Sequence, residues 1–201
     1  MIYNDIIFNT VDFDKFQIDE LELSARLGDM VNVSQLKEYI DKYNSIVNYK
    51  YAYARIDVQT KDDKCIFDFS DVESKALSKV LKDLKEVIIM VLSSGLEVDR
   101  LISRAFIKSQ VEGFILDAIA SAGIESFADY ITNVINEDIA TTNRFSPGYA
   151  DLPMEFQEPL LNRLNASKTV GISLTDKYIM IPSKSITAIM GIKQLEGTIN
   201  G

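Results

Sequence analysis

The sequence predicts a single α+β domain, on three observations. The chain has 201 residues, 47% of them hydrophobic and 25% charged, which is typical of one globular domain that buries a full core. Segments with the two-residue alternation of strands flank a long region with helical spacing of apolar residues. No repeat, low-complexity tract or linker interrupts the chain. We therefore treat residues 1–201 as one domain, with a helical N-terminal segment over 1–50 and a core over 51–201.

The N-terminal segment predicts two helices. Its first residues, up to about position 15, alternate only loosely and are assigned no element. A short helix is expected from Asp19 to Leu27, because its leucines keep helical spacing and Gly28 is a common helix stop. A second helix is expected to begin at Ser34, a favourable N-cap, and to end near Asn48.

Two strands, a helix and a third strand follow. Residues 51–58 alternate as in a half-buried strand, residues 61–64 form a polar turn, and residues 65–69 form a second strand, which together indicate a hairpin. Apolar residues at helical spacing predict an amphipathic helix over 71–85. The continuous apolar run over 86–92 is too short for an isolated helix and indicates a buried strand.

The rest of the chain predicts helices first and strands last. A tight turn at Ser93-Ser94-Gly95 precedes them, and it is interpreted as a plain helix start rather than an anion-binding turn. The expected elements are, in chain order, helices over 96–106 and 110–135, a loop over 136–153, a helix over 154–164, and strands over 170–174, 178–181 and 185–192.

Charge and hydropathy exclude several classes of partner. The formal net charge is −9 and no cluster of Lys and Arg stands out, so binding to nucleic acid or to anionic membrane surfaces is not expected. The longest strongly apolar run, Val87 to Leu92, is far below the roughly 20 residues of a membrane-spanning helix. The N-terminus lacks the features of a secretory signal, and Cys65 has no second cysteine to pair with. These features predict a cytoplasmic protein.

Missing residue types also narrow the chemistry. The chain has no histidine, which excludes serine-type triads and most catalytic zinc sites. Its single cysteine cannot hold an iron–sulfur cluster, and no phosphate-binding glycine motif is present. We therefore predict no catalytic residue and no metal site, and expect any chemistry to reside in a bound ligand.

The most informative segment lies between the last predicted helices, at residues 144–153. Pro147 and Gly148 favour a defined turn, because proline fixes φ and glycine permits positive φ. Arg144 offers a two-pronged donor that suits a carboxylate, and Tyr149 offers a flat apolar face with a hydroxyl group. The alternative interpretation is a plain connector in which Arg144 pairs with a nearby carboxylate.

Several motifs extend this segment and resemble the activation domain of cobalamin-dependent methionine synthase. They are R-x-x-x-G-Y at Arg144–Tyr149, D-L-P-x-E-x-Q at Asp151–Gln157, K-x-x-G-I-x-L-T at Lys168–Thr175 and M-I-P-x-K-S-I-T-A-I at Met180–Ile189. Residues 93–102 and 120–126 are similar to that family as well. The resemblance covers about residues 50–192 and implies a twisted, mixed or antiparallel sheet with flanking helices.

The resemblance implies a site for S-adenosylmethionine. The residues that correspond to ligand-binding positions are Arg144, Ser146, Gly148, Tyr149, Glu125 and Asp138. Arg144 would bind the methionine carboxylate, Tyr149 would lie against the ligand, and the backbone around Ser146 would contact the adenine. Glu125 would meet the ammonium group or the ribose hydroxyls. Asp138 stands where the family has Glu, and Ala150 stands where the family usually has Pro.

The resemblance also implies a role and partners. The expected function is that of a stand-alone activation domain, which binds S-adenosylmethionine and supports the reductive methylation of cob(II)alamin on a separate cobalamin-dependent methionine synthase. Cobalamin would be carried by that partner, and a donor such as flavodoxin would supply the electron. The chain would then be a component of a methyltransferase system and not a complete enzyme. Two alternatives are a reactivation partner for another corrinoid methyltransferase, and a non-catalytic module that senses S-adenosylmethionine or binds a corrinoid protein.

Overall fold

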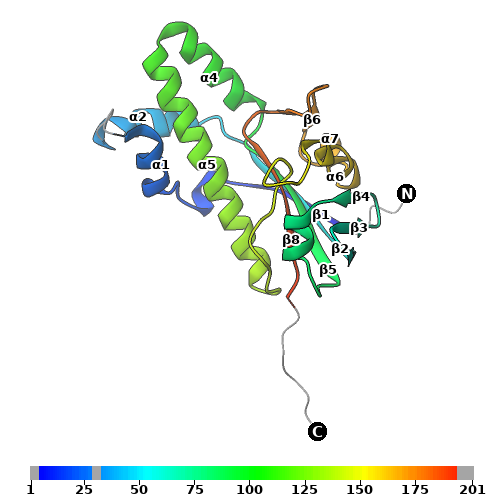
Figure 1. Ribbon diagram of the computed structural model, residues 1–201. Coiled ribbons are helices and arrows are strands. Elements are labelled where there is room, and N and C mark those ends of the chain that lie inside the picture. The colour runs from blue at the N-terminus through cyan, green and yellow to red at the C-terminus, as the bar shows by residue number, and fades with distance from the viewer. Residues whose placement is uncertain (1–4, 29–32, 194–201) are drawn as a thin grey trace.

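An antiparallel sheet forms the centre of the computed structural model, which describes residues 5–28 and 33–193 (Figure 1). Within these residues the sheet has six strands in the order β4-β3-β2-β5-β8, with β1 paired to β2. Its strands are β1 (Ile6–Val11), β2 (Tyr49–Lys61), β3 (Lys64–Phe67), β4 (Asp71–Glu73), β5 (Glu86–Ser93) and β8 (Ser185–Gly191). A separate two-stranded sheet joins β6 (Ser173–Leu174) to β7 (Met180–Ile181).

Helices cover both faces of the central sheet. One face packs against α1 (Glu20–Leu27), α2 (Val33–Asn44), α4 (Leu96–Lys108) and α5 (Gln110–Asn136), which lie together on one side in Figure 1. The other face packs against α3 (Lys75–Val80), α6 (Gln157–Arg163) and α7 (Ala166–Thr169). Two short 3-10 helices, η1 (Phe13–Lys15) and η3 (Met154–Phe156), complete the described helices.

The central strand β5 contributes to both hydrophobic cores. Ile88, Met90 and Leu92 belong to the core beneath α4 and α5, whereas Ile89 and Val91 belong to the core beneath α3 and α6. Successive side chains of a strand point to opposite faces, so an entirely apolar strand fits only between two covered faces. Each of these buried side chains stabilises the fold by about 1.5–3 kcal/mol relative to an exposed position. The prediction of a buried strand over 86–92 is confirmed.

Helix α5 is held against the sheet by a close contact at Gly123. A Cβ atom at this position would lie 2.6 Å from the Tyr43 hydroxyl and 2.7 Å from the Tyr49 hydroxyl. These two hydroxyls share a hydrogen bond of 2.7 Å, and burial raises the pKa of Tyr43 to about 12. This contact fixes the distance between α5 and β2. Glu125 lies on the same helix, two residues after Gly123.

The sequence-based prediction of an α+β fold with an antiparallel sheet and flanking helices is confirmed. The hairpin is formed by β2 and β3, and the helices expected over 96–106 and 110–135 are α4 and α5. Tyr51 and Tyr53 stack on one another and are partly buried against the core, as expected for a half-buried sheet face. Cys65 is a buried core residue, and burial raises the pKa of its thiol to about 11.

In the first half of the chain two predictions are wrong, and one segment without an assigned element forms a strand. Strand β1 forms where no element was assigned, because its main chain pairs with β2 although its side chains are mostly exposed. The single helix expected over 71–85 is replaced by β4 and the shorter α3, since Ser74 is extended and caps α3. Helix α2 ends at Asn44, and it begins at Val33, which places the expected N-cap Ser34 inside the helix.

Boundaries also shift elsewhere in the chain. Gly95, with φ +86°, occupies the N-cap position of α4 and makes no side-chain cap, whereas Ser93 Oγ accepts from the Gly95 N–H. The expected helix over 154–164 is divided into η3 and α6. The strand expected over 170–174 is reduced to two residues because the N–H groups of Val170 and Ile172 donate to the Ala166 carbonyl and continue the turn that ends α7.

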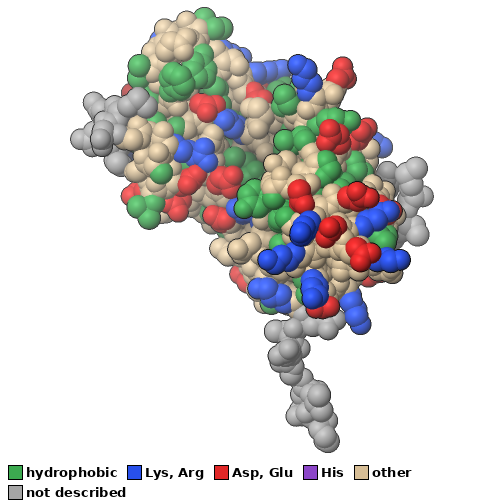
Figure 2. Space-filling model, viewed as in Figure 1, with side chains coloured by type: hydrophobic (Ala, Val, Ile, Leu, Met, Phe, Trp, Pro, Cys, Tyr) green, Lys and Arg blue, Asp and Glu red, His purple; other side chains and the backbone are tan. Residues whose placement is uncertain are grey.

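The described surface mixes charges of both signs. On the face seen in Figure 2, acidic and basic side chains are interspersed rather than gathered into one basic patch. Among the described residues, no helix is both long enough and apolar enough to cross a membrane.

Candidate functional site

The candidate site lies along the open edge of β8, the last strand of the sheet. The chain leaving α5 first pairs with this edge, where Phe145 and Ile189 exchange main-chain hydrogen bonds of 2.9 and 2.8 Å. It then turns away at Pro147, which has no N–H to donate. Because hydrogen bonds alternate along an antiparallel strand, the N–H and C=O of Thr187 point to the same open edge as those of Ile189. A groove of about 400 Å³ remains between this edge, α5 and the 144–147 segment.

A tight turn forms one wall of the groove. The Tyr149 N–H donates to the Ser146 carbonyl at 3.1 Å, and Gly148 within the turn has φ +84°. A Cβ atom at Gly148 would lie 2.5 Å from the Met154 Cε atom, and Met154 itself lines the groove. The turn expected at Pro147-Gly148 is therefore present; the positive φ of Gly148 favours glycine, and an added Cβ would also displace the flexible end of Met154.

The residue after Tyr149 explains one departure from the family pattern. Ala150 has φ +51°, in the left-handed region. Proline is restricted to φ near −65°, so a proline at this position is incompatible with the observed loop. The loop of this chain therefore takes a path that the proline-containing pattern could not follow.

Asp151 fastens the loop to the rest of the domain. Its carboxylate accepts hydrogen bonds from Ser74 Oγ at 2.6 Å and from the N–H of Lys75 at 2.8 Å. The hydrogen bond from Ser74 is the largest cause of the lowered pKa of Asp151, and the backbone N–H groups of Ala76 and Lys75 add to it. The D-L-P motif thus caps the N-terminus of α3 from a distant part of the chain.

Gln157 forms the floor of the groove. Its side chain is buried, its Nε2 donates to the Tyr178 carbonyl at 2.8 Å, and its Oε1 accepts from Thr187 Oγ1 at 3.3 Å. One side chain therefore connects α6, the segment before β7, and β8. A buried amide with partners on both atoms fixes these elements relative to one another.

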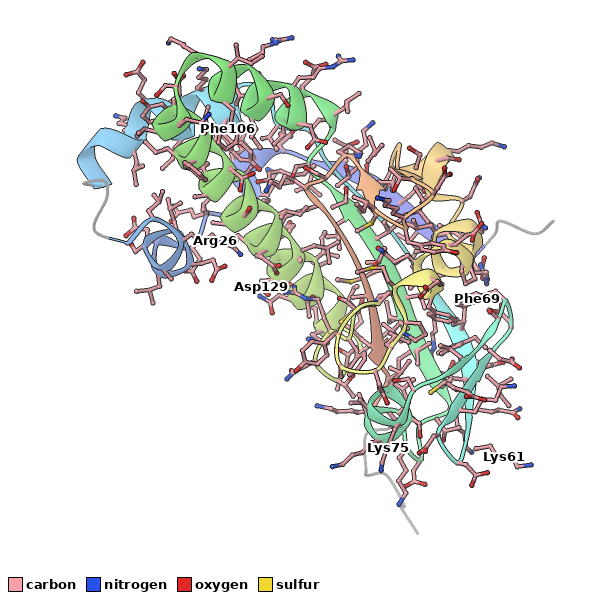
Figure 3. All side chains as sticks on the ribbon, turned by 45° about the horizontal axis from the view of Figure 1, so that its top comes forward. Arg26, Lys61, Phe69, Lys75, Phe106 and Asp129 are labelled. Atoms are coloured by element: carbon pink, nitrogen blue, oxygen red, sulfur yellow. The ribbon has the colours of Figure 1, made fainter. Side chains whose placement is uncertain are left out.

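Arg144 is held against α5 by two carboxylates. Its Nη2 lies 3.2 Å from Glu125 Oε2, and its Nη1 lies 3.0 Å from Asp129 Oδ1. Figure 3 shows Asp129 on the C-terminal half of α5, the half that leads to the 144–153 loop. These pairs also fit the connector interpretation, in which Arg144 meets any nearby carboxylate. The open groove beside Arg144 and Glu125, which both line it, goes beyond a connector.

The other predicted residues are less closely grouped. Ser146 lines the groove, whereas Gly148 and Tyr149 do not. Tyr149 is 66% exposed and contacts Phe145 edge to face, with ring centroids 5.3 Å apart. Asp138 is exposed just beyond the end of α5, where its charge adds to the burial that raises the pKa of Tyr53, and it does not line the groove.

The contact between Asp129 and Arg144 was not predicted from the sequence. Asp129 lies one helical turn after Glu125, so both carboxylates project from the same side of α5. That spacing was available in the sequence, but nothing in it placed α5 beside the 144–153 loop. A second cross-connection, from Lys184 Nζ to Asp117 Oδ1 and to Ser121 Oγ, both at 2.8 Å, joins the start of β8 to the same helix.

A larger cavity of about 520 Å³ lies elsewhere, between η1, α1 and α2. Its walls are mainly apolar, with Phe13, Leu23, Leu36 and Ile40 among them, and none of the six predicted ligand-binding residues lines it. Convergent polar groups fix the orientation of a polar ligand, and the β8 groove has them. The candidate site is therefore the smaller groove.

Comparison with known proteins gives a match in structure alone. No protein-family model matches the chain, and no curated protein matches it in sequence. The fold is similar to a solved structure described as the crystal structure of the MetH reactivation domain bound to AdoHcy, with a TM-score of 0.67. The alignment covers 92% of this chain and 78% of that chain, at 14% sequence identity. The chain thus has the fold of the MetH reactivation domain.

Proposed function

We propose that this chain binds S-adenosylmethionine in the β8 groove and supports the reductive methylation of cob(II)alamin on a separate cobalamin-dependent methionine synthase. One observation carries the proposal: Arg144 and Glu125 line an open groove at the edge of the sheet. The fold in which they do so is similar to that of a domain solved with S-adenosylhomocysteine bound.

The groove suits the chemistry of such a ligand. An α-amino acid end carries a carboxylate and an ammonium group, which match the guanidinium of Arg144 and the carboxylate of Glu125. The adenine end presents donors and acceptors, which suit the backbone around Ser146 and the open N–H and C=O of Thr187. The volume of about 400 Å³ lies within the usual range of small-molecule sites, roughly 300–1,000 Å³.

The role proposed for the chain's own residues is positioning. Asp151 holds the loop that forms one wall of the groove and Gln157 holds its floor, so that Arg144 and the turn at Gly148 present fixed groups to the ligand. S-adenosylmethionine bound there would supply a methyl group, while a partner protein would carry the corrinoid and a donor such as flavodoxin would supply the electron. Holding a reacting group in line accelerates transfer without an acid or base from the protein, in keeping with a chain that has no histidine.

Calorimetric titration tests the binding step. We expect saturable binding of S-adenosylmethionine and of S-adenosylhomocysteine, and a loss of at least about tenfold in affinity for Arg144→Ala, because charge-assisted hydrogen bonds to a carboxylate are lost. Arg104→Ala, an exposed arginine of α4, is the matched control and should bind like the unaltered chain. Absence of binding in the unaltered chain, alone and with a corrinoid protein present, would rule out the proposed site.

A spectroscopic assay tests the role. A cobalamin-dependent methionine synthase without its own activation domain is poised with cob(II)alamin and mixed with this chain, reduced flavodoxin and S-adenosylmethionine. Loss of the cob(II)alamin absorbance that requires both this chain and S-adenosylmethionine would support reactivation. Binding without any conversion, with this synthase or with other corrinoid proteins, would instead indicate a sensing module.

A further inference from the structure

Arg144 is held differently at its two terminal nitrogens. Nη1 lies 3.0 Å from Asp129 Oδ1 and 3.4 Å from Thr132 Oγ1, whereas Nη2 lies 3.2 Å from Glu125 Oε2. Glu125 lines the groove, and neither Asp129 nor Thr132 does. The Nη1 atom is therefore held by residues outside the groove, whereas the Nη2 atom is paired with a residue that lines it.

We propose that Asp129 is a positioning residue for the ligand carboxylate, which keeps Arg144 in place when Glu125 exchanges its partner. This inference rests on the proposed function. When the amino acid end of the ligand enters, its carboxylate takes the place of Glu125 at Nη2, and Glu125 turns to the ligand's ammonium group. Asp129 retains Nη1 throughout, so the guanidinium stays aimed at the groove.

The balance of charge supports this exchange. Two carboxylates face one guanidinium, so the ligand-free site has one negative charge in excess among these three groups. Lys184, which also contacts α5 from the start of β8, lies 2.8 Å from Asp117 and is paired there. A zwitterionic ligand end adds one carboxylate and one ammonium group; in the exchange described above Arg144 pairs with Asp129 and the ligand carboxylate, and the ligand's ammonium group pairs with Glu125.

Hydrogen bonds of Thr132 complete the anchor. Thr132 Oγ1 donates to the Ala128 carbonyl at 2.7 Å, which leaves an oxygen lone pair to accept from Arg144. The side chain of Asp129 is 67% exposed and that of Arg144 is 21% exposed. An ion pair at such a site contributes modestly, so the effect of losing Asp129 should be a few-fold change in affinity rather than abolition.

A double-mutant cycle with two ligands tests the proposal. Asp129→Ala should weaken S-adenosylhomocysteine binding by about three- to fivefold, the range expected for one partly exposed ion pair. It should leave the affinity for 5′-methylthioadenosine unchanged, because that ligand has no amino acid end. In an Arg144→Ala background the same substitution should have no effect, and Asp129→Glu should restore binding. Glu137→Ala, an exposed carboxylate beyond the end of α5, is the matched control.

Three results would overturn the positioning role. They are unchanged binding of S-adenosylhomocysteine by the Asp129→Ala chain, an equal loss for both ligands, and an equal loss in the presence and absence of Arg144. Each of these would leave the proposed function intact. Failure of the unaltered chain to bind S-adenosylhomocysteine at all would overturn both.

Discussion

The Asp151 carboxylate accepts a hydrogen bond of 2.6 Å from Ser74 Oγ, and this contact joins the loop that bears Arg144 to the start of α3. Ser74 also accepts from the N–H of Leu77 at 3.1 Å, so the serine and the aspartate together cap one helix. A loop between two helices is normally among the more mobile parts of a domain. Here the cap holds the loop at a fixed distance from the sheet, and the groove depends on that distance.

Replacing Asp151 should therefore affect both stability and ligand binding. Asp151→Asn should lower the melting temperature, because the charge-assisted bonds to Ser74 and Lys75 are weakened. It should also weaken binding of S-adenosylhomocysteine, since the turn at Gly148 belongs to the same loop and moves with it. Calorimetric melting and titration measure the two effects. Asp176→Asn, in the turn before β7, is a matched control that should change neither.

The contribution of Asp151 should also depend on pH. Its pKa in the folded chain lies below the ordinary value of 3.8, so the folded state favours the ionised carboxylate. The resulting stability is complete above about pH 4 and is lost as pH falls through the lower, folded pKa. Urea unfolding at pH 7 and near pH 3 should show a difference between Asp151→Asn and the unaltered chain that shrinks on acidification. A difference that grows instead would contradict this assignment.

Gly148→Ala should reduce ligand affinity as well as stability. A side chain at φ +84° is strained by about 1–2 kcal/mol, and the new Cβ would also displace the end of Met154, which lines the groove. Gly171→Ala separates the two effects, because Gly171 has φ +75° but no atom within 4 Å of an added Cβ. Both variants should unfold at lower urea concentrations, and only Gly148→Ala should bind S-adenosylhomocysteine more weakly. Equal binding by both variants would show that Met154 does not shape the site.

The local pattern of apolar and polar residues correctly predicted those parts of the fold in which a single requirement, such as burial on both faces, decides the structure. The apolar run of β5 has no stable alternative to a strand covered on both faces, and its prediction is confirmed. The prediction of one helix over 71–85 is wrong because Val72, Leu77 and Leu81 share helical spacing by coincidence. Val72 instead pairs with Cys65 in a strand of three residues, which is too short to show alternation.

The site was only partly predictable for a related reason. Arg144 and the turn at Gly148 could be identified from residue type and from the resemblance, because the whole motif lies within a few residues. The contact between Arg144 and Asp129 depends on the packing of α5 beside a loop that follows it in the chain. The cap of α3 by Asp151 depends on contacts across the sheet, and no local pattern encodes them.

Ala150→Pro should be strongly destabilising, although the resembled family usually has proline here. Proline cannot adopt φ +51°, so the loop would have to be rebuilt or the Asp151 cap broken, at a cost of about 3 kcal/mol. Ala150→Gly relieves the same strain and should leave stability equal or slightly higher. Denaturant unfolding of the two variants measures the contrast. A stable Ala150→Pro chain would show that the loop readily adopts the backbone conformation that proline requires at this position.

Gly123→Ala should be destabilising because it inserts a methyl group against two buried hydroxyls. The added Cβ would lie 2.6 Å from the Tyr43 hydroxyl and 2.7 Å from that of Tyr49, so either α5 or the tyrosines must move. Overpacking of this kind costs about 1–3 kcal/mol and should appear as a lower urea midpoint. The double variant with Tyr43→Phe removes the nearer hydroxyl and should recover part of the loss. If it recovers none, the close approach of α5 to β2 is not what makes glycine necessary. Because Glu125 lies two residues beyond Gly123, Gly123→Ala should also weaken S-adenosylhomocysteine binding. The double variant should recover binding together with stability.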